Sequence, residues 1–328
     1  MEPVPAFETT DAEAAAEPIR LLEDNVARVI RGKAEVIRMA AVSLLARGHI
    51  LIEDVPGVGK TTLSQALARS LGLAFQRIQF TSDLLPSDII GVTIFNQKTQ
   101  AFEFVPGPLF ANVVLADEIN RATPKTQSAL LEAMQDVSVS VGRTTHRLEE
   151  PFLVLATQNP LEMEGTYPLP EAQIDRFFFK LKVGYPAEEA MHGILERTTG
   201  DATTPLSRVL DGPALIEMRR TARSLPIARP VQSYAIRLTL GSHPNSPYAP
   251  PMVKKYVRYG ASPRAAQALV VAGKILALRR GQAFVSPDDI RAAALPALRH
   301  RLILNFEGEA DEIDPDAIVR ELLNSVAP

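Results

Sequence analysis

Lys60 and Thr61 follow a glycine-containing loop, and residues of these types in this order can bind a polyphosphate. The short apolar run at 50–52 predicts a buried strand, and apolar residues at helical spacing predict a helix from residue 60 to Gly72. In a strand, glycine loop and helix of this kind, backbone N–H groups and the helix N-terminus bind phosphate, the lysine reaches the β- and γ-phosphates, and the hydroxyl ligates Mg²⁺. The residues expected to contact a nucleotide here are Val55, Pro56, Gly57, Val58, Gly59, Lys60, Thr61 and Thr62.

The loop departs from the general phosphate-loop pattern at one position. Glycine is expected six residues before the lysine, and Asp54 stands there instead. Gly57 and Gly59 are retained nearest the expected phosphates, so we interpret the segment as a variant phosphate loop and not as an ordinary turn. A carboxylate would repel a polyphosphate, so we predict that Asp54 turns away and braces the loop by accepting backbone N–H bonds.

Asp117 and Glu118 end a second apolar run, at 112–118, which predicts another buried strand. Two adjacent acids can simply be the polar end of a strand. Downstream of a phosphate loop, however, the first acid holds Mg²⁺, largely through water, and the second activates the attacking water. We therefore predict that Asp117 is a metal ligand and that Glu118 is the general base.

Three further polar residues are candidates for the same chemistry. Asn159 follows a predicted strand at 152–157 and could position the water or the γ-phosphate, although an Asn-Pro turn is the alternative. Arg176 offers a planar donor fork for transition-state charge, unless it only pairs with Asp175 or Glu171. Arg264 stands in the first turn of a predicted helix, where an arginine opposes the helix dipole, so a ligand or an acidic partner is the better explanation.

Composition limits the remaining classes. The chain has 328 residues, which suggests about two domains, and 46% of them are hydrophobic, which excludes global disorder. A formal net charge of −3 makes nucleic-acid binding an unlikely main role, and we interpret the basic and aromatic residues at 254–259 as a solvated surface. The absence of cysteine, of an apolar run of roughly 20 residues and of a signal pattern predicts a cytoplasmic protein with no membrane span. The five histidines show no metal-ligand spacing.

The order of predicted elements divides the chain into three parts. Residues 1–16 are expected to be flexible, 17–186 to form an α/β nucleotide-binding domain, and 187–328 to form a small all-helical domain. The α/β part is expected to be a five-stranded parallel sheet with two β-hairpin insertions, one at 91–105 and one at 137–148. Its last strand, at 177–183, alternates lysines with apolar residues, which suits the edge of a sheet.

Five motifs make the chain resemble the AAA+ ATPases, and among them the MoxR family, over residues 20–305. They are Glu-Asp-Val-Pro-Gly-Val-Gly-Lys-Thr at 53–61, Asp-Glu-Ile-Asn-Arg-Ala at 117–122, Ala-Thr-Gln-Asn-Pro at 156–160, Gly-Thr-Tyr-Pro-Leu-Pro-Glu-Ala-Gln at 165–173 and Gly-Ala-Ser-Pro-Arg-Ala at 260–265. The resemblance implies a role for each candidate: Lys60 and Thr61 in Walker A, Asp117 and Glu118 in Walker B, Asn159 as sensor 1, Arg176 as arginine finger, Arg264 as sensor 2, and Ile30 and Gly32 at the adenine pocket. The two hairpins match the helix-2 insert and the pre-sensor-1 hairpin of a clade that includes magnesium chelatase motor subunits.

The function that we expect is Mg²⁺-dependent ATP hydrolysis in a homo-oligomeric ring of six subunits, coupled to remodelling or maturation of a protein client. The resemblance also implies a partner with a von Willebrand factor A (VWA) domain, which no residue spacing indicates. The alternatives are a nucleic-acid motor, a chelatase-like metal-insertion motor and a nucleotide switch that does not hydrolyse ATP. Glu118 argues against the last of these.

Overall fold

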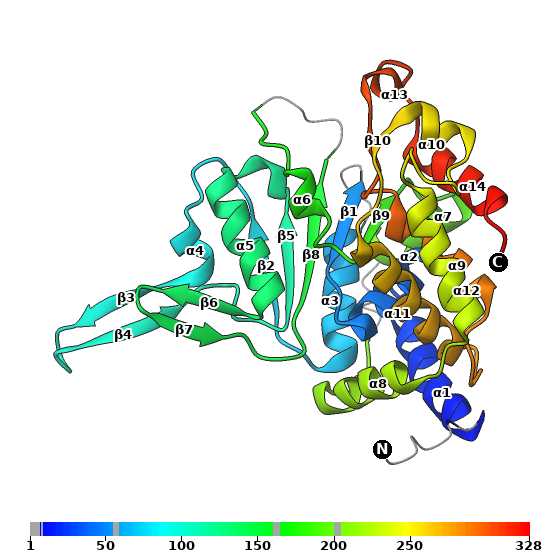
Figure 1. Ribbon diagram of the computed structural model, residues 1–328. Coiled ribbons are helices and arrows are strands. Elements are labelled where there is room, and N and C mark those ends of the chain that lie inside the picture. The colour runs from blue at the N-terminus through cyan, green and yellow to red at the C-terminus, as the bar shows by residue number, and fades with distance from the viewer. Residues whose placement is uncertain (1–6, 8, 55–58, 160–164, 200–204) are drawn as a thin grey trace, which may run out of the picture. The chain divides into compact units, whose positions relative to one another are not determined.

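The computed structural model describes residues 7, 9–54, 59–159, 165–199 and 205–328, and the chain forms two compact units (Figure 1). The first unit contains residues 22–176 and 181–215. The second contains residues up to 21, 177–180 and 216–328. Helix α1 (Thr9–Ala27), strand β9 (Phe179–Val183) and helix α8 (Gly212–Ser224) each have residues in both units.

A parallel sheet lies at the centre of the first unit, as predicted. Within the described residues its five strands follow the order β2-β5-β8-β1-β9, so that β9 is at an edge. Strands β5 and β8 are buried along almost their whole length, which explains their continuous apolar sequences. Besides β9, the strands are β1 (Ile50–Asp54), β2 (Phe75–Gln79), β5 (Val113–Asp117) and β8 (Leu153–Gln158).

Parallel pairing brings the carboxyl ends of the central strands to one edge of this sheet. Glu53 of β1 is in register with Gln158 of β8, and Asp117 of β5 is in register with Gln79 of β2. Helix α3 begins at this same end, because it follows β1 after the phosphate loop, and it packs on β2 and β5. The other helices of this unit are α2 (Ala34–Ala46), α3 (Lys60–Leu71), α4 (Pro86–Ile90), the 3₁₀ turn η1 (Ile119–Arg121), α5 (Pro124–Asp136), α6 (Glu171–Ile174) and α7 (Glu188–Thr199).

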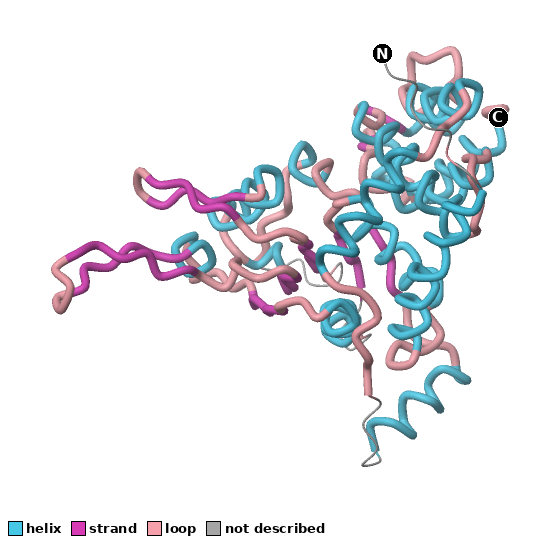
Figure 2. Tube along the Cα trace, turned by 90° about the horizontal axis from the view of Figure 1, so that it is seen from below, coloured by secondary structure: helices cyan, strands magenta, loops and turns pink. Residues whose placement is uncertain are grey.

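Two antiparallel hairpins extend from this unit, side by side and away from the sheet (Figures 1 and 2). One consists of β3 (Gly91–Asn96) and β4 (Ala101–Pro106), and the other of β6 (Ser138–Val141) and β7 (Thr144–Arg147). The rings of Phe104 and His146 stack with centroids 3.8 Å apart and join the two hairpins. Both insertions therefore lie where the sequence predicts them.

The second unit is helical, as predicted, and also contains a short pair of strands. The domain was expected to be all-helical, but α12 ends at Leu298, and Ile303 and Leu304 form a strand that pairs with β10. The elements are α9 (Arg229–Gly241), α10 (Pro251–Tyr256), β10 (Val257–Tyr259), α11 (Pro263–Arg279), α12 (Pro287–Leu298), β11 (Ile303–Leu304), α13 (Phe306–Ala310) and α14 (Pro315–Ser325).

Helix α1 begins at Thr9, inside the segment 1–16 that was expected to be flexible. Ala12 and Ala16 are buried and continue, at helical spacing, the buried face of Ile19, Leu22 and Val26. The sequence pattern does not reveal this part of the buried face, because alanine is only weakly hydrophobic. No helix in the described part of the chain is both long and apolar enough to cross a membrane.

Candidate active site

The helix that follows the phosphate loop begins with Lys60 directly after Gly59. Gly59 has a φ of 92°, a left-handed conformation that glycine adopts at little cost, and Lys60 is the first residue of α3. Thr61 and Thr62, in the same turn, are half-buried. The predicted nucleotide contacts Val55, Pro56, Gly57 and Val58 lie outside the described residues, as does the side chain of Asp54, so the predicted brace remains a prediction.

Asp117 lies at the end of β5 with three partners around a side chain that is only 4% exposed. Lys60 Nζ is 3.2 Å from Oδ1, and Thr157 Oγ1 donates a hydrogen bond of 2.7 Å to the same oxygen. Arg77 binds Oδ2 through both Nη2, at 2.6 Å, and Nε, at 3.2 Å. Burial alone would raise the pKa of Asp117, but the bonds from Thr157 and Arg77 and the charge of Lys60 outweigh it and hold the pKa below its ordinary value. Asp117 is therefore a stable carboxylate.

Glu118 has a different environment although it is the next residue. Its φ of 58° is left-handed, and its backbone N–H donates to Thr157 Oγ1 at 2.9 Å. Carboxylate oxygen Oε2 accepts a bond from Gln79 Nε2 at 2.7 Å and lies 3.3 Å from Arg121 Nε. The side chain is 25% exposed, so one acid of the pair is enclosed by cations while the other remains accessible to water.

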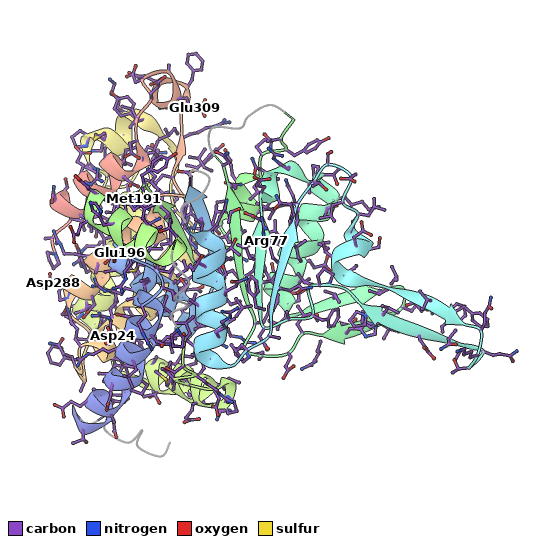
Figure 3. All side chains as sticks on the ribbon, turned by 180° about the vertical axis from the view of Figure 1, so that it is seen from behind. Asp24, Arg77, Met191, Glu196, Asp288 and Glu309 are labelled. Carbon is purple, nitrogen blue, oxygen red and sulfur yellow. The ribbon has the colours of Figure 1, made fainter. Side chains whose placement is uncertain are left out.

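Arg77, Gln79 and Thr157 contact the two acids, and sequence reasoning assigned them no role. Arg77 and Gln79 alternate along β2 (Figure 3 labels Arg77), which is the neighbour of β5. Arg77 Nη2 also donates to Gln79 Oε1 at 2.8 Å, so the two residues act on the acids as one group. The signal was the run of polar residues at alternate positions of a strand. These alternating polar residues indicate part of the site only when the strand order, which places β2 beside β5, is known.

The resemblance assigned Ile30 and Gly32 to the adenine site. Of these two residues, only Ile30 lines a small pocket beside Lys60. Its lining residues are Ile30, Lys33, Val36, Ile52, Gly59, Lys60, Leu63 and Val183. Ile30 lines this pocket together with Gly59 and Lys60, and its role at the adenine remains a prediction. Gly32 is absent from this lining, and a Cβ there would come within 2.6 Å of the Ala190 Cβ, so the glycine allows α7 to approach closely.

The remaining predicted residues occupy three places. Asn159, buried, follows β8 at the sheet edge that carries Asp117. Arg176 lies in the turn after α6, half-buried; its guanidinium forms no hydrogen bond or ion pair with the described residues, so the pairing with Asp175 or Glu171 is not made. Arg264 belongs to the second unit, in the first turn of α11, where its backbone N–H donates to Ser262 Oγ. Lys60, Asp117, Glu118 and Asn159 are thus brought together within the first unit.

The oxygen donors of this site suit Mg²⁺. In the part of the chain that the structure describes, no group of three or more histidine or acidic side chains forms a metal-binding cluster. Mg²⁺ does not require one, because it retains several waters and binds through one or two carboxylates together with substrate phosphates. The Asp117 carboxylate and the Thr61 hydroxyl, both on the phosphate-loop side of the sheet, provide such a minimal set.

Comparison with known proteins agrees with this fold and site. The ATPase family associated with various cellular activities (AAA) matches residues 49–179, and the AAA lid domain matches residues 251–322. The parallel sheet, the helical C-terminal region and these two matches define an AAA+ ATPase.

Relatives of full length narrow the class further. The uncharacterized protein YeaC of Bacillus subtilis is 44% identical over 92% of this chain and 92% of its own, and Chaperone MoxR1 of Mycobacterium tuberculosis is 42% identical over 96% of this chain and 84% of its own. A crystal structure from Cytophaga hutchinsonii, of a protein provisionally described as an ATPase, superposes with a TM-score of 0.90 at 39% identity and covers 97% of both chains. The chain belongs to the MoxR family of AAA+ ATPases.

Proposed function

We propose that this protein hydrolyses ATP at the edge of the sheet formed by Lys60, Asp117 and Glu118. The observation that carries the proposal is the enclosed Asp117 carboxylate, held among Lys60, Arg77 and Thr157, next to an accessible acid. Cations and hydrogen bonds fixed before the substrate binds lower the cost of stabilising charge during phosphoryl transfer. This arrangement supports a phosphoanhydride hydrolase.

Each side chain has a separate task in this proposal. Asp117 and Thr61 would hold Mg²⁺, which neutralises charge on the phosphates, and Lys60 would bind the β- and γ-phosphates. Glu118 accepts a proton from the attacking water. Because Gln79 and Arg121 both engage Oε2, the other oxygen, Oε1, is the one that remains for the water. Asn159 orients that water or the γ-phosphate from the end of β8.

We further propose that the enzyme works as a hexameric ring in which Arg176 reaches the nucleotide of a neighbouring subunit. Arg176 precedes the edge strand β9, whereas Asp117 ends β5 and Lys60 follows β1, two strands further inside the sheet. A guanidinium without a partner among the described residues is available for charge supplied by another chain. Arg264 is proposed to contact nucleotide as sensor 2.

The energy of hydrolysis is proposed to drive remodelling or maturation of a protein client, with a VWA-domain protein as partner. Family membership supports this part, together with the printed name of the Mycobacterium tuberculosis relative as a chaperone. A protein trapped with ATP bound can capture both the client and the partner.

Replacement of the proposed base tests the hydrolase. Glu118→Gln should bind ATP with Mg²⁺ as the wild type does and lose turnover by roughly a hundredfold or more, because only the positioned base is removed. Glu132→Gln, on the exposed face of α5, is the matched control and should leave turnover unchanged. Wild-type turnover in purified Glu118→Gln, with contaminating ATPases excluded, would refute the assignment.

Mixing two inactive variants tests the ring. The Arg176→Ala chain keeps its own phosphate site but has lost its arginine finger. The Lys60→Ala chain has a defective phosphate site but keeps its arginine finger. A mixture should recover part of the activity, and the recovery should rise with protein concentration because it requires mixed assemblies. Recovery that stays absent when mixed assemblies are demonstrated by native mass spectrometry would show that Arg176 acts within its own subunit or not at all.

The Glu118→Gln protein, loaded with ATP, also tests the role of hydrolysis. We expect it to retain a protein client or a VWA-domain protein through affinity purification, and Lys60→Ala to release both. A salt-sensitive shift of DNA mobility at physiological ionic strength, with no retained protein, would instead favour the nucleic-acid motor.

A further inference from the structure

Three consecutive residues at the end of α12 bind the backbone of the segment that directly follows Arg176. Arg301 donates to the carbonyl oxygens of Phe177, at 2.7 Å, and Phe178, at 3.3 Å. His300 Nε2 lies 3.0 Å from the same Phe177 oxygen, and Arg299 Nη1 donates to the Lys180 oxygen at 3.2 Å. We call residues 299–301 the carbonyl clamp.

Further bonds hold the carbonyl clamp within the helical unit. Arg299 forms a two-point ion pair with Asp316 of α14, with Nε–Oδ1 at 2.9 Å and Nη2–Oδ2 at 3.1 Å. Arg301 is 6% exposed and also donates to the Ala297 carbonyl oxygen, in the last turn of α12. His300 is half-buried and neutral, since desolvation and the charge of Arg301 lower its pKa, and its Nε2 is therefore the nitrogen that donates to Phe177. Residues 177–180 are thus fixed to the helical unit.

On its other side, Arg176 follows a segment that is fixed to the first unit. Gln127 Nε2 donates to the Tyr167 carbonyl oxygen at 2.9 Å, and Tyr167 N–H donates to the Asn120 carbonyl oxygen at 2.6 Å. Gln173 of α6 contacts Ser128 at 3.4 Å. Arg176 is the last residue of this stretch, and the next residue, Phe177, belongs to the helical unit.

We propose that the carbonyl clamp positions the arginine finger, so that the helical unit controls whether Arg176 reaches the neighbouring site. The clamp acts on Phe177, the residue directly after Arg176, because Arg301 and His300 both bind its carbonyl oxygen and so fix the backbone beside the finger. The inference rests on the proposed trans action of Arg176. It makes Arg299, His300 and Arg301 positioning residues that never touch nucleotide.

The proposal requires that the clamp matters only in the subunit that donates the finger. We start from the mixture of Lys60→Ala, the donor, with Arg176→Ala, the acceptor. Arg301→Lys is then placed in one or the other, since lysine retains the charge but cannot bind two carbonyls as a fork. We expect the change in the donor to reduce the recovered activity on the order of ten- to a hundredfold, the loss typical of small misplacements, and in the acceptor to have little effect.

Two further variants separate positioning from general damage. Arg280→Lys alters another arginine of the helical unit, one that pairs with Asp289 and does not approach residues 177–180, and it should have no effect in either subunit. His300→Leu removes the bond to Phe177 and should act only in the donor, while His300→Gln, which keeps an N–H donor, should restore part of the activity. Native mass spectrometry confirms that every mixture assembles.

The outcomes are distinct. Loss confined to the donor supports the carbonyl clamp. Equal loss in donor and acceptor, or no loss in either, overturns it while leaving the trans finger intact. If the starting mixture itself recovers no activity, the proposed function of Arg176 fails, and the clamp as a positioning device fails with it.

Discussion

Asp117 at the end of β5 and Arg176 in the turn after α6 are both charged residues of the proposed site. They differ in whether their charge is paired with other residues of the same chain. Asp117 is enclosed by Lys60, Arg77 and Thr157 before any nucleotide binds, whereas the guanidinium of Arg176 has no partner among the described residues. An enclosed carboxylate with fixed partners is organised within one chain. A half-buried arginine without a partner among the described residues suits the proposed contact with a neighbouring subunit.

The largest expected effect tests the Arg176 side of this comparison. Arg176→Ala should lose on the order of 10³ or more in turnover, the loss of an arginine finger in related chemistry, and retain nucleotide affinity. Arg69→Ala, an exposed arginine on α3, is the control and should behave as the wild type.

Dilution makes this prediction sharper. Turnover per wild-type chain should fall as assemblies dissociate and approach the residual value of Arg176→Ala, which itself should not depend on concentration. ATPase assays over a dilution series, with the assembly state followed by light scattering, provide the measurement. A wild-type turnover that stays constant while the assembly dissociates would mean that the site is complete within one chain.

A smaller effect is expected on the Asp117 side. Arg77→Met removes the two bonds to Oδ2 and should lower turnover roughly ten- to a hundredfold, as the loss of a residue that orients a metal-binding carboxylate generally does. The Mg²⁺ concentration needed for half-maximal activity should rise, because the orientation of Asp117 is lost. Titration of Mg²⁺ at fixed ATP measures both effects.

Two controls show whether the effect belongs to Asp117. Arg77→Lys should recover part of the activity, since an ammonium can still approach Oδ2. Arg47→Met breaks the ion pair with Glu150 and should change neither quantity, because Arg47 lies before β1, at the end of the sheet opposite to the acids. An unchanged Mg²⁺ requirement in Arg77→Met would show that Arg77 is only a surface partner of the acid.

The parts of the fold that the sequence predicted are those with a strong local pattern. The strands at 113–117 and 153–158 are continuous apolar runs, and Pro263 and Pro287 mark the starts of their helices. Residues 303–304 were assigned to a helix because their pairing with β10 depends on a segment about 45 residues earlier in the chain, which no local window contains. The start of α1 was missed for a related reason, since Ala12 and Ala16 are buried by tertiary packing.

The same distinction applies to the site. Lys60, Asp117 and Glu118 follow recognisable strand ends, so their chemistry was readable from residue type and spacing. Arg77 and Thr157 required the strand order, because each touches Asp117 from a neighbouring strand that lies about 40 residues away in sequence. Polar residues whose role comes from sheet neighbours are therefore the ones that a motif search leaves out.

Backbone strain gives the last and smallest test, because Glu118 and Val137, two of the non-glycine residues with a left-handed conformation in the first unit, lie at different places. Glu118, with φ of 58°, lies in the site, and Val137, with φ of 51°, ends α5 and lines a different pocket, with Arg47, His49 and Glu150. A β-branched residue in this region is strained by about 1–2 kcal/mol, whereas asparagine adopts it readily. Val137→Asn should therefore raise the free energy of unfolding by about 1 kcal/mol, and the melting temperature by roughly 2 °C.

Val141 is a half-buried valine in β6 with ordinary strand geometry, and Val141→Asn is the matched control. This variant should lower the free energy of unfolding, since asparagine disfavours strands. Turnover should not change in Val137→Asn, because the left-handed conformation of Val137 only allows the chain to turn from α5 into β6. A fall in turnover with the fold intact would mean that the hairpin after Val137 takes part in catalysis, in addition to the end of β5 and the turn at Arg176.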